Sequence, residues 1–302
     1  MSTAVTTETR IARMEISAET ITAYLADGRA ISVPLAWSWR LSEATPTQRA
    51  NWRLIGDGHG VHWPDIDEDY RFDWMAETVK AIQDRGYAVA GELYQTIFEI
   101  AWLMRGMENL LGDFLLNEDV AHAICEKLTV LRIRQAAKFA EAGVDIIRLG
   151  DDVAAQKGAF MSLDIYQKFL KERTRRIINS ARRVRPDILI FMHSDGSIKD
   201  FIPEYIDIGV DILNPVQPEC NDLEAIGKQY GGKISFWGGI GTQTTMPFGT
   251  VEDVRNAVRS VHTQLGSQGG LLLAPSHILE PEVPWENVLA FVEAARESRY
   301  ES

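Results

Sequence analysis

A histidine and an aspartate, two residues apart, follow an apolar run near the middle of the sequence. The run is "DILIFM", residues 187–192, and His193 and Asp195 come directly after it. Side chains alternate along an extended chain, so His193 and Asp195 point to the same side. An imidazole nitrogen and a carboxylate oxygen can hold zinc or iron, and both groups can transfer protons. The alternative is structural: His193 forms a hydrogen bond at a strand end, and Asp195 caps the next helix.

Two more ionisable residues end apolar runs elsewhere in the chain. His277 follows the run in "LLLAPSH", and Glu92 ends the run in "YAVAGEL". His193, Asp195 and His277 together offer two nitrogens and one carboxylate, a set that suits zinc or iron with open coordination positions. The same set suits a metal-free site in which the imidazoles hold substrate carboxylates. Glu92 is a catalytic candidate because a partly apolar pocket favours a protonated acid that can donate its proton; the alternative is a solvated acid.

Adjacent carboxylates follow a further run, "DIIRLGDD", at Asp151 and Asp152. Neighbours on an extended chain point to opposite sides, so we expect one of them at most to face a site and the other to cap the following turn. Asp151 is the catalytic candidate of the pair and Asp152 the substrate-binding one. Polar side chains and exposed backbone N–H groups after the other runs provide the remaining candidates for substrate binding, which are Gln156, Gln217, Gly239 and Ser276.

The elements that must position these residues alternate regularly from residue 76 onward. Near-continuous apolar runs are typical of parallel strands buried on both faces, and they lie at 87–93, 145–152, 187–196, 211–218, 234–241 and 271–277. Helical patterns lie between them, at 97–111, 118–141, 163–184, 198–207, 222–230 and 251–266. Such alternation predicts a parallel sheet, either an open doubly wound sheet or a barrel. No Gly-x-Gly-x-x-Gly follows the first run, which argues against a dinucleotide site.

The first 72 residues do not show this alternation of apolar runs and helical patterns. "ITAYLADGRAISVPL" contains two alternating runs around Asp27–Gly28, which predicts a β-hairpin. Ser42 is expected to cap a short helix that runs to about Trp52, and the rest is rich in turns. We therefore expect two domains, a small β-rich one over 1–72 and a β/α one over 73–302.

Composition excludes several classes of protein. The formal net charge is −12 with a pI near 5.0, which argues against a nucleic-acid binder or a protein of anionic membranes. The two cysteines imply no disulfide framework and favour a reducing, cytoplasmic location. We see no signal peptide and no apolar run near the ~18 residues of a membrane span. The expected partner is a small-molecule substrate.

The strand ends also resemble a known family. "GDDVAAQKGAFMSLDIYQKFL", "HSDGSIKDFIPEYIDIGVDILNPVQPE", "YGGKISFWGGIGTQTTMPFGT" and "GGLLLAPSHILEPEVPWENVLAF" are similar to the uroporphyrinogen decarboxylase superfamily. The likeness covers about 76–298 and is nearer to decarboxylase-like bacterial members related to the cobalamin-dependent methyltransferases. It implies a (β/α)₈ TIM-barrel-like fold with the site at its C-terminal mouth. Only six of the eight strands are matched, so the first two are expected to be missing. Residues 1–72 look like a small bacterial domain of unknown function.

The resemblance implies three alternative functions. The first is a decarboxylase-like lyase, which needs no cofactor. The second is a corrinoid/thiol methyltransferase, in which zinc or iron at His193, Asp195 and His277 activates a thiol and a corrinoid protein is the partner. Relatives of that kind have His-x-Cys where this chain has Asp195. The third is a recombined barrel fragment without turnover, whose N-terminal module mediates interactions. In each case the N-terminal hairpin or a second copy of the chain would cover the open barrel edges.

Overall fold

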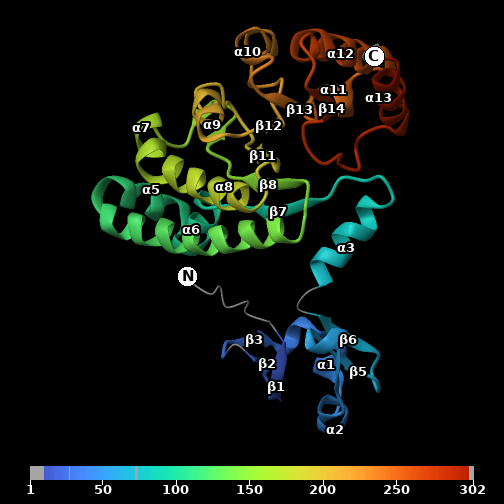
Figure 1. Cartoon of the computed structure of the whole chain (residues 1–302). Helices are drawn as coiled ribbons and strands as arrows, with labels where there is room; N and C mark the ends of the chain where they lie inside the picture. The colour runs from blue at the N-terminus through green and yellow to red at the C-terminus, as the bar shows by residue number, and fades with distance from the viewer. Residues whose placement is uncertain (1–9, 27, 72–73, 299–302) are drawn as a thin grey trace. The chain divides into compact units, whose positions relative to one another are not determined.

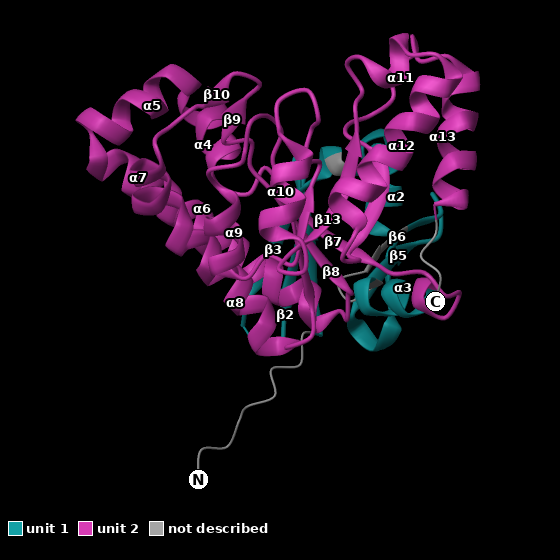
Figure 2. Cartoon of the chain, turned by 90° about the horizontal axis from the view of Figure 1, so that it is seen from above, with its two compact units in different colours: residues 1–81 teal, residues 82–302 magenta. Residues whose placement is uncertain are grey.

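The computed structural model describes residues 10–26, 28–71 and 74–298 (Figure 1). Contacts divide the chain into two units, residues 1–81 and residues 82–302, which Figure 2 colours separately. The domain boundary expected between 72 and 73 falls on residues outside those described, and it stays a prediction. No helix in the described ranges has the length and apolarity needed to cross a membrane.

The N-terminal unit is the β-rich module that the sequence predicts. One antiparallel sheet has the order β1-β2-β3 and the other the order β4-β5-β6. Their strands are β1 (Ile11–Ile16), β2 (Thr20–Leu25), β3 (Ala30–Pro34), β4 (Arg53–Ile55), β5 (Gly60–Trp63) and β6 (Glu68–Arg71). Fully buried Ile21, Leu41 and Trp63 belong to one core cluster. The β2–β3 hairpin is present, with Gly28 at φ +88°, whereas Asp27 lies outside the described residues.

The prediction of one short helix that is capped by Ser42 and runs to about Trp52 is wrong. Two short helices replace it, α1 (Trp39–Glu43) and α2 (Pro46–Ala50), with the 3₁₀ turns η1 (Leu35–Trp37) and η2 (Gly56–Gly58) nearby. Ser38 caps α1, and Thr45 caps α2 in a capping box with Gln48. The residue before a proline avoids the helical region, so Pro46 ends the first helix and starts a second.

The second unit is built on a six-stranded parallel sheet of the order β14-β13-β12-β11-β8-β7. The strands are β7 (Ala90–Tyr94), β8 (Ile146–Gly150), β11 (Leu189–His193), β12 (Ile212–Asn214), β13 (Ser235–Ile240) and β14 (Leu271–Pro275). Five of the six predicted apolar runs contain one of them, and the run at 87–93 overlaps β7, which ends one residue later at Tyr94. The fold is TIM-barrel-like, and within the described residues β7 and β14 are unpaired edges, which agrees with a barrel that lacks two strands.

Helices cover the outer face of this sheet. They are α4 (Phe98–Arg105), α5 (Met107–Leu116), α6 (Glu118–Glu141), α7 (Leu163–Tyr166), the π-helical turn η3 (Gln167–Lys171), α8 (Glu172–Val184), α9 (Ile202–Ile208), α10 (Leu223–Tyr230), α11 (Thr245–Phe248), α12 (Val251–Gly266) and α13 (Trp285–Glu297). Helix α3 (Trp74–Gln83) and the two-residue strands β9 (Ala154–Ala155) and β10 (Gly158–Ala159) complete the described elements. In Figure 1, α6 and α8 lie side by side. Phe139 of α6 packs against Gly91 of β7, and Val261 of α12 packs against Gly239 of β13.

The sequence predicts strands that are buried on both faces, but the inner face of the sheet is partly exposed. Leu149 and Leu213 face the helices and are fully buried, whereas Leu189 and Leu272 are 44% and 50% exposed. Side chains alternate between faces along each strand, so one face is covered and the other is open. Burial on both faces needs a closed barrel or a second layer, and the described residues of this unit form an open sheet of six strands.

Replacement of two helical glycines by alanine is expected to change the stability of the protein in opposite directions. A Cβ on Gly227 of α10 would lie 1.8 Å from the backbone oxygen of Gln264 in α12, so Gly227→Ala must push the helices apart. We expect it to lower the free energy of unfolding by about 1–3 kcal/mol or more. A Cβ on Gly112 of α5 would meet no neighbouring atom within 4 Å, so Gly112→Ala should raise stability by about 0.5–1 kcal/mol. Urea unfolding of both variants tests the pair, and equal shifts would contradict the close approach of α10 and α12.

Candidate active site

The ends of β8, β11 and β12 meet at one edge of the sheet. His193, the last residue of β11, pairs with Gly150 on one side and with Asn214 on the other. Asp152 and Asp195 follow their strands by two residues, and the backbone N–H of Asp195 donates to Asp152 Oδ1 at 2.8 Å. Residues far apart in the sequence therefore come together because parallel strands finish at the same rim.

The imidazole of His193 is buried and held in one orientation. Its Nδ1 lies 2.6 Å from Asn214 Oδ1, and Asn214 Nδ2 donates to the carbonyl of Trp237 at 2.7 Å. The second bond turns the amide so that its oxygen faces the ring, and Nδ1 must therefore be the protonated nitrogen. In the neutral ring, the lone pair is therefore on Nε2. Hydrogen bonds of this kind orient and strengthen metal-binding histidines in other proteins.

Nε2 of His193 points between two carboxylates. It lies 3.8 Å from Asp152 Oδ1 and 3.8 Å from Asp195 Oδ1. One ligand atom from each of the three residues lies within 4.8 Å of the others. Asp195 Oδ1 is buried and has no hydrogen-bond partner. Ligand atoms at ~2.0–2.2 Å from one cation are about 3.4 Å apart, so the three residues fit a divalent metal ion after small side-chain movements.

His277 lies at the margin of this group. Its Nε2 is 4.0 Å from Asp195 Oδ2, and 47% of its side chain is exposed. The sequence predicts a metal set of His193, Asp195 and His277, whereas the group of possible ligands that lie within 4.8 Å of one another in the described residues is Asp152, His193 and Asp195. Asp152 is expected from the sequence to bind substrate, and the structure places its Oδ1 3.8 Å from His193 Nε2, in a group that leaves out the expected third ligand, His277; the identity of the third ligand stays a prediction.

Asp151 faces away from the rim. It is 8% exposed and accepts hydrogen bonds from the backbone N–H groups of Ile97 and Glu99, at 2.9 and 3.0 Å. Burial raises the pKa of Asp151 to about 6, against the lowering effect of these backbone donors. The opposite orientations of Asp151 and Asp152 follow the alternation predicted for adjacent residues. With its oxygens committed to the β7–α4 loop, Asp151 is placed to hold that loop rather than to touch a ligand.

Two ionisable residues near the cluster were missed by the sequence analysis. Glu99 is 4% exposed, and its Oε2 accepts from the backbone N–H of Asp152 at 3.3 Å. Burial, followed by the charges of Asp151 and Asp152, raises the pKa of Glu99 to about 8. The Tyr94 ring lies 5.5 Å from the His193 ring, and burial together with nearby carboxylates raises its pKa to about 12. A lone acid in the apolar stretch "TIFEIAWL" was the signal that could have found Glu99.

The other predicted residues divide between the rim and the scaffold. A hollow of about 340 Å³ beside His193 is lined by Glu92, Tyr94, Arg148, Asn214, Pro275, Ser276, His277 and Ile278. A neighbouring hollow of about 410 Å³ includes Asp195, His277 and Gln217 in its lining. Gln217 also accepts from the backbone N–H of Gly196 at 2.7 Å, and Gln156 donates to Gln243. Gly239, at φ +86°, packs against α12 and is part of the scaffold.

Comparison with known proteins identifies the family. A family model described as uroporphyrinogen decarboxylase (URO-D) matches residues 42–298. The chain belongs to the uroporphyrinogen decarboxylase family. The match starts within the N-terminal unit, earlier than the start near residue 76 inferred from the sequence.

Individual relatives are distant. The uroporphyrinogen decarboxylase of Legionella pneumophila strain Philadelphia 1 is 26% identical over 195 residues, which are 64% of this chain and 52% of that protein. The one from Coxiella burnetii strain RSA 493 is 23% identical over 260 residues, 83% of this chain and 69% of that protein. The chain thus spans about half the length of the Legionella relative. A methyltransferase from Methanosarcina mazei superimposes with a TM-score of 0.59 at 22% identity, covering 75% of this chain and 64% of that one, and shares the fold.

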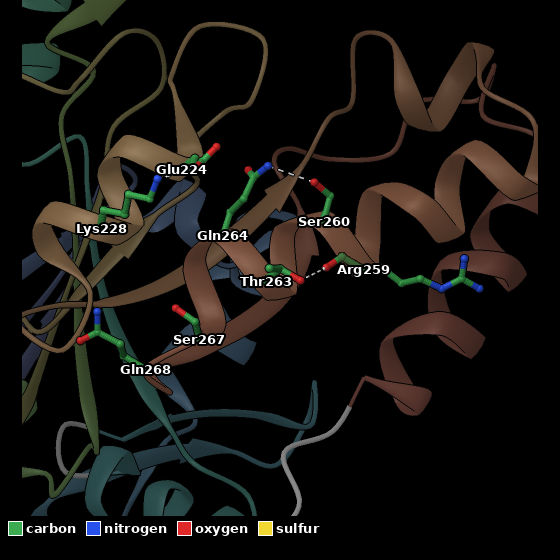
Figure 3. A pocket seen from close by; sticks show the side chains of 8 residues that line it. All are labelled: Glu224, Lys228, Arg259, Ser260, Thr263, Gln264, Ser267 and Gln268. Atoms are coloured by element: carbon green, nitrogen blue, oxygen red, sulfur yellow. Dashed lines mark hydrogen bonds and ion pairs between the residues drawn. The ribbon is translucent and has the colours of Figure 1, made fainter.

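A further hollow of about 600 Å³ lies outside the sheet, between α10 and α12 (Figure 3). Its charged side chains pair locally: Lys228 with Glu224, and Arg259 with Glu252. Thr263 donates to the carbonyl of Arg259, and Gln264 donates to Ser260. These are the contacts of a solvated helix surface. In TIM-barrel-like enzymes such as those of the uroporphyrinogen decarboxylase family, the site lies at the C-terminal strand ends, which is where His193 stands.

Proposed function

We propose that this member of the uroporphyrinogen decarboxylase family is a metal-dependent enzyme that transfers a methyl group to a thiol at the strand ends. The observation that carries the proposal is the cluster of Asp152, His193 and Asp195, with ligand atoms within 4.8 Å of one another. The fixed imidazole and the unpartnered Asp195 Oδ1 support it independently.

Each residue of the cluster would have a defined task. Asp152, His193 and Asp195 would hold the cation, and zinc is the first choice for two carboxylates and one imidazole, with iron second. When bound, the cation supplies a Lewis acid that lowers the pKa of a thiol at an open coordination position. Asn214 keeps His193 in the binding tautomer. The hollow of about 340 Å³ beside His193 has room for a small thiol, and a corrinoid protein would donate the methyl group.

Decarboxylation is the second candidate. The curated relatives named above are decarboxylases, and Arg148 in the rim hollow could pair with a substrate carboxylate. Against it, Glu92 lines that hollow and Asp195 lines the neighbouring one, and carboxylates at these positions disfavour a polycarboxylate. This reaction needs no metal, so the two candidates differ in their response to a chelator.

The test combines metal analysis with two assays. The purified protein is expected to retain about one zinc or iron per chain, and to demethylate methylcobalamin in the presence of small thiols, followed by the absorbance of the corrinoid. Dialysis against a chelator should remove this activity, and zinc should restore it. Folded protein that binds neither metal would contradict the proposal. Chelator-resistant release of carbon dioxide from uroporphyrinogen would favour the second candidate.

A further inference from the structure

The open inner face of the sheet contains a hollow distinct from the one at the rim. Its volume is about 600 Å³, and it is lined by Ala88, Ala90, Glu92, Ile146, Arg148, Phe191, Asn214, Trp237 and Leu272. Most of these side chains are apolar, and two are large aromatic rings. Phe191 and Trp237 meet edge to face, with ring centroids 5.4 Å apart. A ligand of matching shape would therefore be flat and largely apolar.

Strand register explains why these side chains share one surface. Glu92 of β7 pairs with Arg148 of β8, and Arg148 pairs with Phe191 of β11. Trp237 of β13 pairs with Leu272 of β14 in the same way. Paired residues on neighbouring strands point to the same face, which here is the face without helices. The structure therefore places Arg148 on the inner face.

Among the described residues that line this hollow and the two rim hollows, Arg148 is the only arginine or lysine. Its guanidinium lies 5.6 Å from the ring centroid of Tyr94 and 5.4 Å from that of Phe191. One of its donors, Nη1, bonds to Glu92 Oε1 at 2.7 Å. Arginine carries five N–H donors in a planar fork, so a single carboxylate leaves it with capacity for a second anion.

The inner hollow adjoins the rim hollow beside His193. Both are lined by Glu92, Arg148 and Asn214. Asn214 touches the imidazole of His193 and thereby marks the boundary between the two hollows. A ligand anchored at Arg148 would reach the candidate metal cluster at one end and the aromatic surface at the other.

We infer that the inner hollow binds a flat aromatic carboxylate, with its ring against Phe191 and Trp237 and its carboxylate on Arg148. As a statement about the substrate of the rim site it rests on the proposed function, but binding itself needs no metal. Glu92 competes with the ligand for the guanidinium, because both are carboxylates that accept from the same donors. Removal of the Glu92 charge should therefore strengthen ligand binding, and removal of Arg148 should weaken it.

Calorimetric titration with 2-naphthoate and its neutral analogue 2-naphthamide tests this inference on the chelator-treated full chain. We expect Arg148→Met to weaken naphthoate binding by about 10-fold or more and to leave naphthamide within about 2-fold. Glu92→Gln should tighten naphthoate binding, and Arg148→Lys should retain part of it. Arg259→Met removes an equal charge from the outer hollow of Figure 3 and is expected to have no effect.

The outcomes separate this inference from the proposed function. Loss of naphthoate binding in Arg148→Met, with binding retained in His193→Ala, supports the anion site whatever the metal result. Absence of saturable naphthoate binding to the wild-type protein overturns the inference. Equal weakening of naphthoate and naphthamide by Arg148→Met also overturns it, because the arginine would then act only as a packing group.

Discussion

Replacing His193 with alanine is expected to lower the affinity for zinc by more than about 100-fold. Disruption of a hydrogen bond behind a metal-binding histidine already costs about 10–100-fold, and the alanine variant lacks the ligand itself. The remaining Asp152 and Asp195 would repel each other without the imidazole nitrogen between them. Titration with a competing chelator gives the affinity, and circular dichroism checks that the variant is folded.

Three comparison variants make this result specific. His277→Ala removes a half-exposed imidazole 4.0 Å from Asp195 Oδ2, and we expect its zinc affinity to stay within about 10-fold of wild type. Asn214→Leu should weaken binding by about 10–100-fold, whereas Asn214→Asp keeps an acceptor for the Nδ1 proton and should restore it. Equal losses in His193→Ala and His277→Ala would instead favour the metal set expected from the sequence.

The regular elements were predictable because their signals are local. Each of the six apolar runs overlaps a strand, and the helix predicted at 251–266 begins after Thr250, which forms a capping box with Asp253. The helix predicted over 97–111 breaks at Gly106, where φ is +83°, so it forms α4 and α5. The run at 211–218 yields only Ile212–Asn214, because Pro215 cannot donate to the ladder.

The site was predictable only where spacing along one strand decides the geometry. His193 and Asp195 lie together because His193 ends β11 and Asp195 follows it by two residues. Asn214 could not be assigned its contact with His193, because register between strands depends on packing across the whole sheet. Glu99 lies in a helix and joins the cluster only through the fold of the β7–α4 loop. Contacts of this kind arise from tertiary structure, and a single sequence carries no direct signal of them.

The buried Glu99 is expected to make the metal-free protein less stable as pH rises. Its pKa is raised from 4.5 to about 8 by burial and by neighbouring carboxylates. An acid whose pKa is higher in the folded state binds more protons when folded, so its contribution is fully present below the unfolded pKa. That contribution is lost as pH rises through about 8. The loss should be about 2–4 kcal/mol between pH 4.5 and pH 8.5.

Glu99→Gln isolates this effect, since glutamine keeps an oxygen for the Asp152 N–H and carries no charge. We expect the variant to be more stable than wild type at pH 8.5, and the difference to shrink toward pH 5, in urea unfolding at each pH. Glu92→Gln is the matched control, because it removes a carboxylate that is 54% exposed instead of a buried one. A difference between Glu99→Gln and wild type that stays constant across this range would mean that Glu99 is ionised throughout. Zinc should flatten the wild-type curve, because a bound cation offsets the carboxylates that raise the pKa of Glu99.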